Sequence, residues 1–133
     1  MPAFSMYVHG THDALDSVLD ATSFVACERR RPGQVVGGHT VTADACWFSA
    51  LASRPDATAF EEHVSDAMQF LRERYDDIRT TSHVVGVSDV ELSFGFEWAH
   101  RAHLFRLPPP LLLLAGELNL PITLRFLEQP TKT

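Results

Sequence analysis

The sequence predicts an α+β fold in which one mostly antiparallel sheet carries two to three helices packed on one face. Three observations support this prediction. Residues 90–98 alternate between apolar and polar side chains, as a strand does when one of its faces is buried. Residues 60–78 repeat apolar side chains at three- and four-residue steps, which is typical of a helix lying on such a sheet. The turns are short and the strand patterns one-sided, which favours this arrangement over a doubly wound parallel sheet.

A first strand is predicted at residues 4–9, where apolar and polar side chains alternate until Gly10. Thr11 then suits the N-cap of a helix, because its hydroxyl can accept a backbone N–H that lacks a partner in the first turn. The apolar stripe of this helix consists of Leu15, Val18 and Leu19. Another of its faces carries three carboxylates at i, i+3, i+7 spacing, namely Asp13, Asp16 and Asp20.

Two further strands and a loop are predicted before the long helix. Residues 23–28 indicate a short strand, and residues 29–40 indicate a long loop because they contain one proline and three glycines. Residues 41–50 indicate a strand that places Val41, Ala43, Ala45 and Trp47 on one side.

The second half of the chain supplies the main helix and its sheet partner. The apolar face of the helix at 60–78 is expected to cover the apolar side of the strand at 90–98, and residues 83–87 could add a short preceding strand. Three prolines at 108–110 predict the start of a last helix through Leu118, since proline is tolerated in a first turn. Asn119 suits a left-handed cap, and residues 122–126 alternate as a final strand.

Length and charge limit the classes of function. The 133 residues are expected to form one domain, 1–133, with a frayed tail from Gln129. The net charge is −6, and the one basic run, at 29–31, adjoins a Pro-Gly turn, so nucleic acid is not an expected partner. The apolar run at 111–114 is far shorter than the ~20 residues of a bilayer span, and a signal peptide is not recognisable, so no membrane association is expected.

The two cysteines, Cys27 and Cys46, lack the spacing of a metal knuckle and do not form a disulfide framework. Each lies in an apolar run, so both are expected to be buried thiols. A reducing, cytoplasmic compartment is the corresponding prediction.

Several landmarks resemble the DUF4279 family of small uncharacterised bacterial proteins. They are Pro32-Gly33-Gln34, Cys46-Trp47-Phe48, the helix at 60–78 and the segment 111–126. The resemblance covers about residues 4–127 and rests on structural rather than catalytic features, so it carries no site residues with it. It implies an immunity or accessory protein of a bacterial toxin system.

No recognisable catalytic motif is present, so we expect a protein that is not an enzyme, and no cofactor is predicted. The nucleophile-elbow and phosphate-loop patterns do not occur. A metal site needs three or four converging ligands, and no spacing rule joins the histidines, so no metal is predicted. The seven histidines are His9, His12, His39, His63, His83, His100 and His103.

The leading hypothesis is a non-enzymatic protein-binding module with a basic partner such as a toxin. Its surface would combine Asp13, Asp16 and Asp20 with the polar strand side that carries Glu91, Ser93, Gly95 and Glu97, because complementary charge speeds association and sets specificity. The alternative is a small-molecule or metal-binding site at the 32–47 loop and strand, near His39 and Trp47. A third hypothesis is self-association through an edge strand or the leucine-rich last helix.

Overall fold

The computed structural model describes residues 3–98 and 105–128, with the side chains at 97–98 and 126–128 excepted. The predicted tail from 129, together with His100 and His103, lies outside the described residues. In chain order the elements are β1 (Ala3–Gly10), α1 (His12–Ala21), β2 (Glu28–Arg30), β3 (Val35–Val36), β4 (His39–Thr40), β5 (Cys46–Leu51), α2 (Phe60–Glu73), α3 (Tyr75–Ser82), β6 (Val87–Trp98), α4 (Pro109–Glu117) and β7 (Ile122–Glu128).

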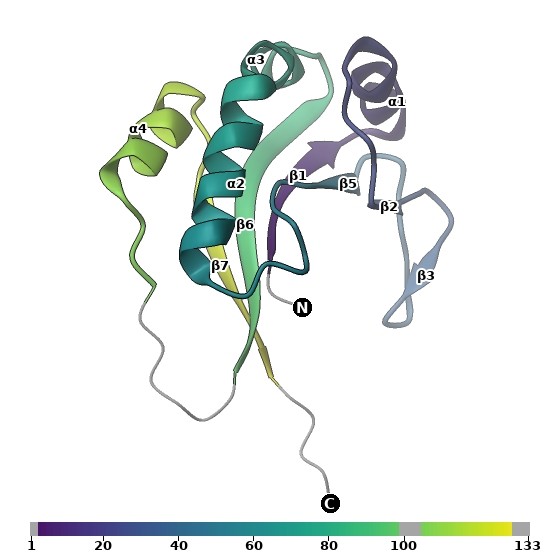
Figure 1. Ribbon diagram of the computed structural model, residues 1–133. Helices are drawn as coiled ribbons and strands as arrows, with labels where there is room; N and C mark the ends of the chain where they lie inside the picture. The colour runs from purple at the N-terminus through teal and green to yellow at the C-terminus, as the bar shows by residue number, and fades with distance from the viewer. Residues whose placement is uncertain (1–2, 99–104, 129–133) are drawn as a thin grey trace, which may run out of the picture.

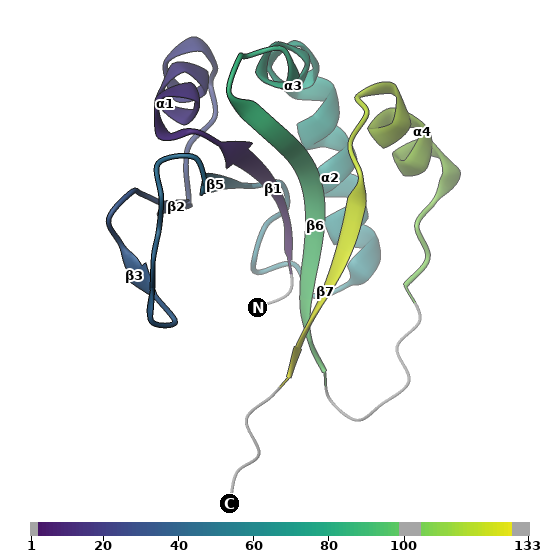
Figure 2. The same ribbon diagram turned by 180° about the vertical axis from the view of Figure 1, so that it is seen from behind.

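The main sheet has five strands in the order β2-β5-β1-β6-β7, and β3 pairs with β4 in a separate two-stranded hairpin. All neighbours in the main sheet are antiparallel except β6 and β7, which are parallel. The helices lie on one face of this sheet, as the two opposite views show (Figures 1 and 2). The predicted α+β fold, with a mostly antiparallel sheet and helices on one face, is therefore confirmed.

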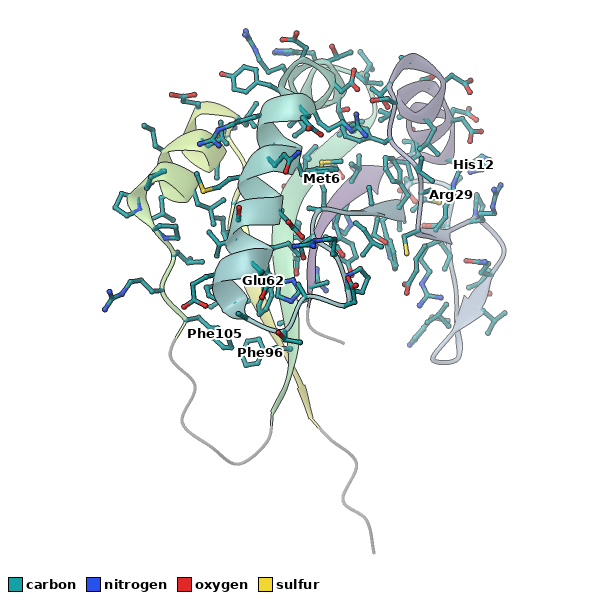
Figure 3. The ribbon with its side chains drawn as sticks, viewed as in Figure 1. Met6, His12, Arg29, Glu62, Phe96 and Phe105 are labelled. Carbon is teal, nitrogen blue, oxygen red and sulfur yellow. The ribbon has the colours of Figure 1, made fainter. Side chains whose placement is uncertain are left out.

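The core lies between the helices and the sheet, and the long helix covers β6 as expected. Phe94 of β6 is 1% exposed, and its ring centroid lies 5.0 Å from that of Phe60 in α2 and 4.8 Å from that of Phe4 in β1. Phe105, which precedes α4, closes one end of this cluster beside Phe96, with ring centroids 4.3 Å apart (Figure 3). Stacked and tilted aromatic rings thus connect the two layers.

The helix predicted at 60–78 is divided in two at Arg74. Arg74 ends α2 with φ −103° and ψ 15°, and its N–H donates to the Phe70 carbonyl before α3 begins at Tyr75. Ile78 and Thr81 of α3 are then fully buried. The periodicity of the apolar residues continues across the break, so the pattern alone predicts one helix where the structure has two.

The boundaries between α1 and α2 also differ from those expected. β5 begins at Cys46 rather than at residue 41, because Thr42 and Asp44 form a turn in which the Thr42 hydroxyl donates to the Asp44 carboxylate at 2.6 Å. β2 begins at Glu28, so only its first residue falls in the predicted 23–28 strand. The expected loop contains the β3–β4 hairpin, whose turn uses Gly37 and Gly38 at φ 56° and 80°, as a two-residue turn with two positive φ angles requires.

The remaining predicted features are placed as expected, except that residues 83–87 form no separate strand, since β6 itself begins at Val87. The Thr11 hydroxyl accepts the Ala14 N–H and caps α1. Asn119 has φ 55° after α4. Among residues 3–98 and 105–128, no helix is both long and apolar enough to cross a bilayer.

Candidate functional site

The face of the sheet opposite the helices is the candidate functional site. Successive side chains of a strand point to opposite faces, and Phe4, Met6 and Val8 of β1 are fully buried beneath the helices. The odd-numbered positions therefore point the other way. The strand register aligns them in cross-strand rows, which include Leu51–Ser5–Ser93–Thr123, Glu28–Ser49–Tyr7–Glu91 and Arg30–Trp47–His9–Asp89.

A groove of about 420 Å³ lies on this uncovered face. Five of the residues that line it are small, namely Ala3, Ser5, Ser49, Ser93 and Gly95. Ser49 and Ser93 are only 4% and 2% exposed, and the Ser49 hydroxyl has no hydrogen-bond partner among the described residues. A nearly buried hydroxyl that opens into a groove is available to a bound group. The lining residues are Ala3, Ser5, Tyr7, Cys27, Glu28, Ser49, Leu51, Pro55, Ser93, Gly95 and Arg125.

A polar network around Glu91 forms one side of the site. Arg125 donates from Nη2 to Glu91 Oε1 at 2.5 Å and from Nε to Ser93 Oγ at 2.8 Å. The Thr123 hydroxyl donates to Glu91 Oε2 at 2.9 Å, and His9 Nε2 lies 3.6 Å from Oε1. Burial by itself would raise the pKa of Glu91, but the hydrogen bonds from Thr123 and Arg125 outweigh it, so this pKa lies below its ordinary value.

The lowered pKa of Glu91 predicts a specific loss of stability in acid. A carboxyl group whose pKa is lower in the folded state stabilises the fold above its unfolded pKa of about 4.3, and that contribution is lost as the pH falls through the folded value. The Glu91→Gln variant should therefore be less stable than wild type at neutral pH, and the difference should shrink in acid. Urea unfolding at a series of pH values would measure this convergence.

A matched control for this prediction is Glu61→Gln, which changes an exposed residue of α2. The pKa of Asp16 is lowered by its hydrogen bond to Arg29 and that of Asp66 by its hydrogen bond to Arg54. Both carboxylates are unchanged in the variant, so the difference from wild type reports Glu91 alone. A gap in unfolding free energy that stays constant with pH would contradict the prediction.

Aromatic and guanidinium groups form a band across the same face. Tyr7 occupies its centre, with its ring centroid 5.3 Å from that of Trp47. The Arg125 guanidinium lies 4.6 Å from the Tyr7 ring and the Arg30 guanidinium 5.4 Å from the Trp47 ring. Cation–π stacking holds all four groups in place before any partner arrives. Tyrosine, tryptophan and arginine are the residue types enriched at the energetic centres of protein interfaces.

The groove is lined by two charged residues, which differ in their surroundings. Arg125 is engaged by Glu91. Glu28 at the other side is exposed, and its carboxylate has no ion-pair partner among the described residues. The groove is also lined by Leu51, which is 43% exposed, and by Pro55. The groove therefore offers an apolar wall and one uncompensated negative charge.

The acidic helix face predicted as part of one binding surface lies on the other side of the sheet. Leu15 and Val18 of α1 are fully buried in the core, which places this helix on the covered face, away from Glu91. Asp13 and Asp20 are exposed. The structure therefore separates the carboxylates of α1 from Glu91, which the leading sequence hypothesis combined in one binding surface.

Asp16 is tied to residues of its own chain. Arg29 donates from Nη2 to its carboxylate at 2.6 Å, and His12 Nε2 lies 3.5 Å from it. His12 and Arg29 lie side by side in Figure 3. This carboxylate therefore has less charge to offer a partner than Asp13 and Asp20 do.

The other predicted site residues are distributed over the two sheets. Trp47 is half-buried on the uncovered face next to Tyr7, and Glu97 lies in β6 opposite Leu127 of β7. His39 is exposed in the β3–β4 hairpin and is not among the residues that line the groove. Within 3–98 and 105–128, no group of three or more His, Cys, Asp or Glu side chains is arranged to hold a metal ion.

The site includes residues that were not singled out from the sequence, among them Tyr7, Glu28, Arg30, Ser49 and Arg125. Tyr7 and Arg125 occupy polar positions of alternating strands, so the pattern indicates that they face away from the core. Their proximity depends on β1 and β7 both lying next to β6, which residue spacing within one strand does not indicate.

The groups with nucleophilic potential have different environments. Ser53 and His63 form a hydrogen-bonded pair at 2.8 Å, but they are 6% and 1% exposed and lie in the core. Cys46 is buried as predicted, and burial raises the pKa of its thiol. Cys27 is exposed, contrary to the prediction, because it precedes β2 at the groove wall. Both cysteines are free thiols.

The fold and the site define a two-layer α+β protein with one covered and one uncovered sheet face. Comparison of the sequence with models of protein families and with curated proteins finds no match. The resemblance to the DUF4279 family therefore stays a prediction.

Proposed function

We propose that this protein is a non-enzymatic binding module that receives a basic segment of a partner protein on the uncovered face of its sheet. The observation that carries the proposal is the groove in which Glu28 is uncompensated while Arg125 is held by Glu91. A lysine or arginine side chain can lay its methylene groups along Leu51 and Pro55 and bring its charge to Glu28. The Ser49 hydroxyl supplies a hydrogen-bonding group in the groove.

The aromatic band supports a protein partner. Tyr7 and Trp47 provide large contact areas that lose little conformational entropy on binding, because stacking with Arg125 and Arg30 already restrains them. Small residues lie beside large aromatic ones, so the surface of this face is uneven and a partner can be complementary to it in shape.

An immunity protein that neutralises a basic toxin is the particular role we propose within this class. The charge of the groove and the resemblance to the DUF4279 family support that role. The two free thiols, one of them exposed, support a reducing compartment such as the cytoplasm.

The proposal is tested by titrating the protein with a short peptide of alternating arginine and glycine, followed by amide chemical shifts. We expect saturable shifts at Glu28, Ser49 and Ser5, weaker at high salt because exposed charges are screened. Glu28→Gln should lower the affinity by roughly three- to tenfold, which corresponds to about 1 kcal/mol. An acidic peptide of equal length should give no saturable shifts.

A double variant on α1, Asp13→Asn with Asp20→Asn, is the matched control. It removes two exposed carboxylates from the covered side of the molecule and should leave the binding of the arginine peptide unchanged. If binding is lost in this double variant and retained in Glu28→Gln, the acidic helix face is the contact surface and the groove proposal is wrong.

A small-molecule site is the second candidate function, and the volume of the groove favours it. About 420 Å³ falls within the range of ligand pockets. The groove lies over the strands rather than at the 32–40 loop, so a ligand there would contact Ser49 and Ser93 instead of His39. A neutral fragment that shifts these serine amides and also binds Glu28→Gln equally well would support this candidate over the first.

A further inference from the structure

The two edges of the main sheet differ in how well they are protected. β2 forms one edge, but it has three residues, all of them charged, and Pro32 follows closely. β7 forms the other edge with seven residues, and it contains neither proline nor lysine. A long edge strand presents a row of unpaired backbone donors and acceptors, which proteins usually blunt with such residues. With respect to residues 3–98 and 105–128, the outer edge of β7 is therefore the one open to a further strand.

Exposed apolar side chains occur on β7 and on the neighbouring helix α4. Leu124 of β7 is 36% exposed although it points to the helix-covered side. Leu112 and Leu113 of α4 are 48% and 66% exposed. α4 lies beside the start of β7 in both views (Figures 1 and 2), so three of the eight large hydrophobic residues that are exposed in the described part of the chain belong to these two neighbouring elements. A strand added here would cover apolar surface as well as form hydrogen bonds.

We propose that a second copy of this chain binds at this edge, with the two β7 strands antiparallel about Leu124 and the two five-stranded sheets joined into one. A two-fold axis at that position sets Leu124 opposite itself and Thr123 opposite Arg125 of the partner subunit. Both pairs are compatible, since leucine meets leucine and a hydroxyl meets a guanidinium, whereas an axis at Arg125 would set like charges together. This self-complementarity favours a second copy over an unrelated strand.

The position of α4 is compatible with this pairing. Because α4 lies beside the start of β7, the two-fold axis places the two copies of this helix at opposite ends of the joined strands. Of the residues that line the groove, Arg125 is the one on β7, and Glu28 and Ser49 lie away from this edge, so the inference does not rest on the proposed function.

The test is disulfide cross-linking at the two-fold axis. A cysteine placed there lies directly opposite the same cysteine of the second copy. Residues directly opposite in an antiparallel pair have Cα atoms about 4.5–5.5 Å apart, which suits a disulfide. Leu124→Cys is made in a Cys27→Ser background and oxidised at micromolar concentration. Val25→Cys in the same background is the control, since residue 25 is 80% exposed and precedes β2, which forms the opposite edge of the sheet from β7. We expect rapid covalent dimerisation of the residue 124 variant only.

Sedimentation provides the second readout. Wild type should sediment as a dimer at micromolar concentration, and Leu124→Glu should sediment as a folded monomer, with its fold verified by circular dichroism. Val85→Glu, at a position 95% exposed in the turn before β6, should remain dimeric. A monomeric wild type, a dimer that persists in Leu124→Glu, or equal cross-linking at 25 and 124 would each overturn the inference.

Discussion

Replacing Phe94 by alanine should lower the free energy of unfolding by about 3–5 kcal/mol, the cost typical of truncating a buried aromatic ring. Phe94 is 1% exposed, and its ring centroid lies within 6 Å of four other phenylalanines and of His63. These neighbours belong to both the sheet and the helix layer and pack against one another. They therefore cannot easily move into the cavity that the substitution would leave. The loss is a large part of the 5–15 kcal/mol that stabilises a typical domain.

Urea unfolding at neutral pH measures this loss from the transition midpoint. Val25→Ala is the control, because Val25 is 80% exposed and should change stability by less than about 0.5 kcal/mol. A loss below about 1.5 kcal/mol for Phe94→Ala would mean that the aromatic cluster between α2 and β6 does not hold the layers together.

Replacing His63 by alanine should cost about 2–4 kcal/mol, because the ring satisfies two buried polar groups as well as filling space. His63 is 1% exposed in α2. A carbonyl oxygen can only accept, so the His63 Nε2–H donates to Ala57 at 2.9 Å, and Nδ1 is hydrogen-bonded to the Ser53 hydroxyl at 2.8 Å. Ser53 Oγ in turn accepts the Phe4 N–H at 2.7 Å. The variant removes the hydrogen bond to the Ala57 carbonyl and the one between His63 and the Ser53 hydroxyl, while the Phe4 N–H still donates to Ser53.

Further variants separate the polar contribution from the packing. His63→Phe restores most of the ring volume but not the hydrogen bonds, so it should recover only part of the loss. Ser53→Ala should cost about 1–3 kcal/mol, and the double variant less than the sum, since the two residues share one network. His83→Ala, at an exposed position, is the control. Additive losses for Ser53 and His63 would show that they act independently.

The structural role of His63 could not be predicted from the sequence. From the sequence it is one of seven histidines available as a ligand or base. In the structure it lies one turn of helix after Phe60, with Val64 and Ala67 buried beside it, and it connects α2 to the start of β1. Its partners Ser53 and Ala57 belong to the segment that enters the helix, where no repeating pattern predicts the backbone path.

The surroundings of Glu91 were likewise only partly predictable from the sequence. Alternation placed Glu91 on the uncovered side, which the structure confirms through its contacts with Thr123 and Arg125. The alternation of polar and apolar residues does not indicate that Thr123 and Arg125 donate hydrogen bonds to the Glu91 carboxylate. The acidic residues of α1 share a face at helical spacing, yet the sheet lies between them and Glu91.

The sequence by itself determined the layers of this protein, because the burial of apolar side chains imposes a period of two on strands and of about 3.6 on helices. It therefore predicted which residues of β1, α2 and β6 meet in the core. Only the tertiary structure decided the order β2-β5-β1-β6-β7, and that order brings Tyr7, Trp47, Glu28 and Arg125 to one face. Strand order depends on contacts between residues far apart in the chain, which local periodicity does not encode.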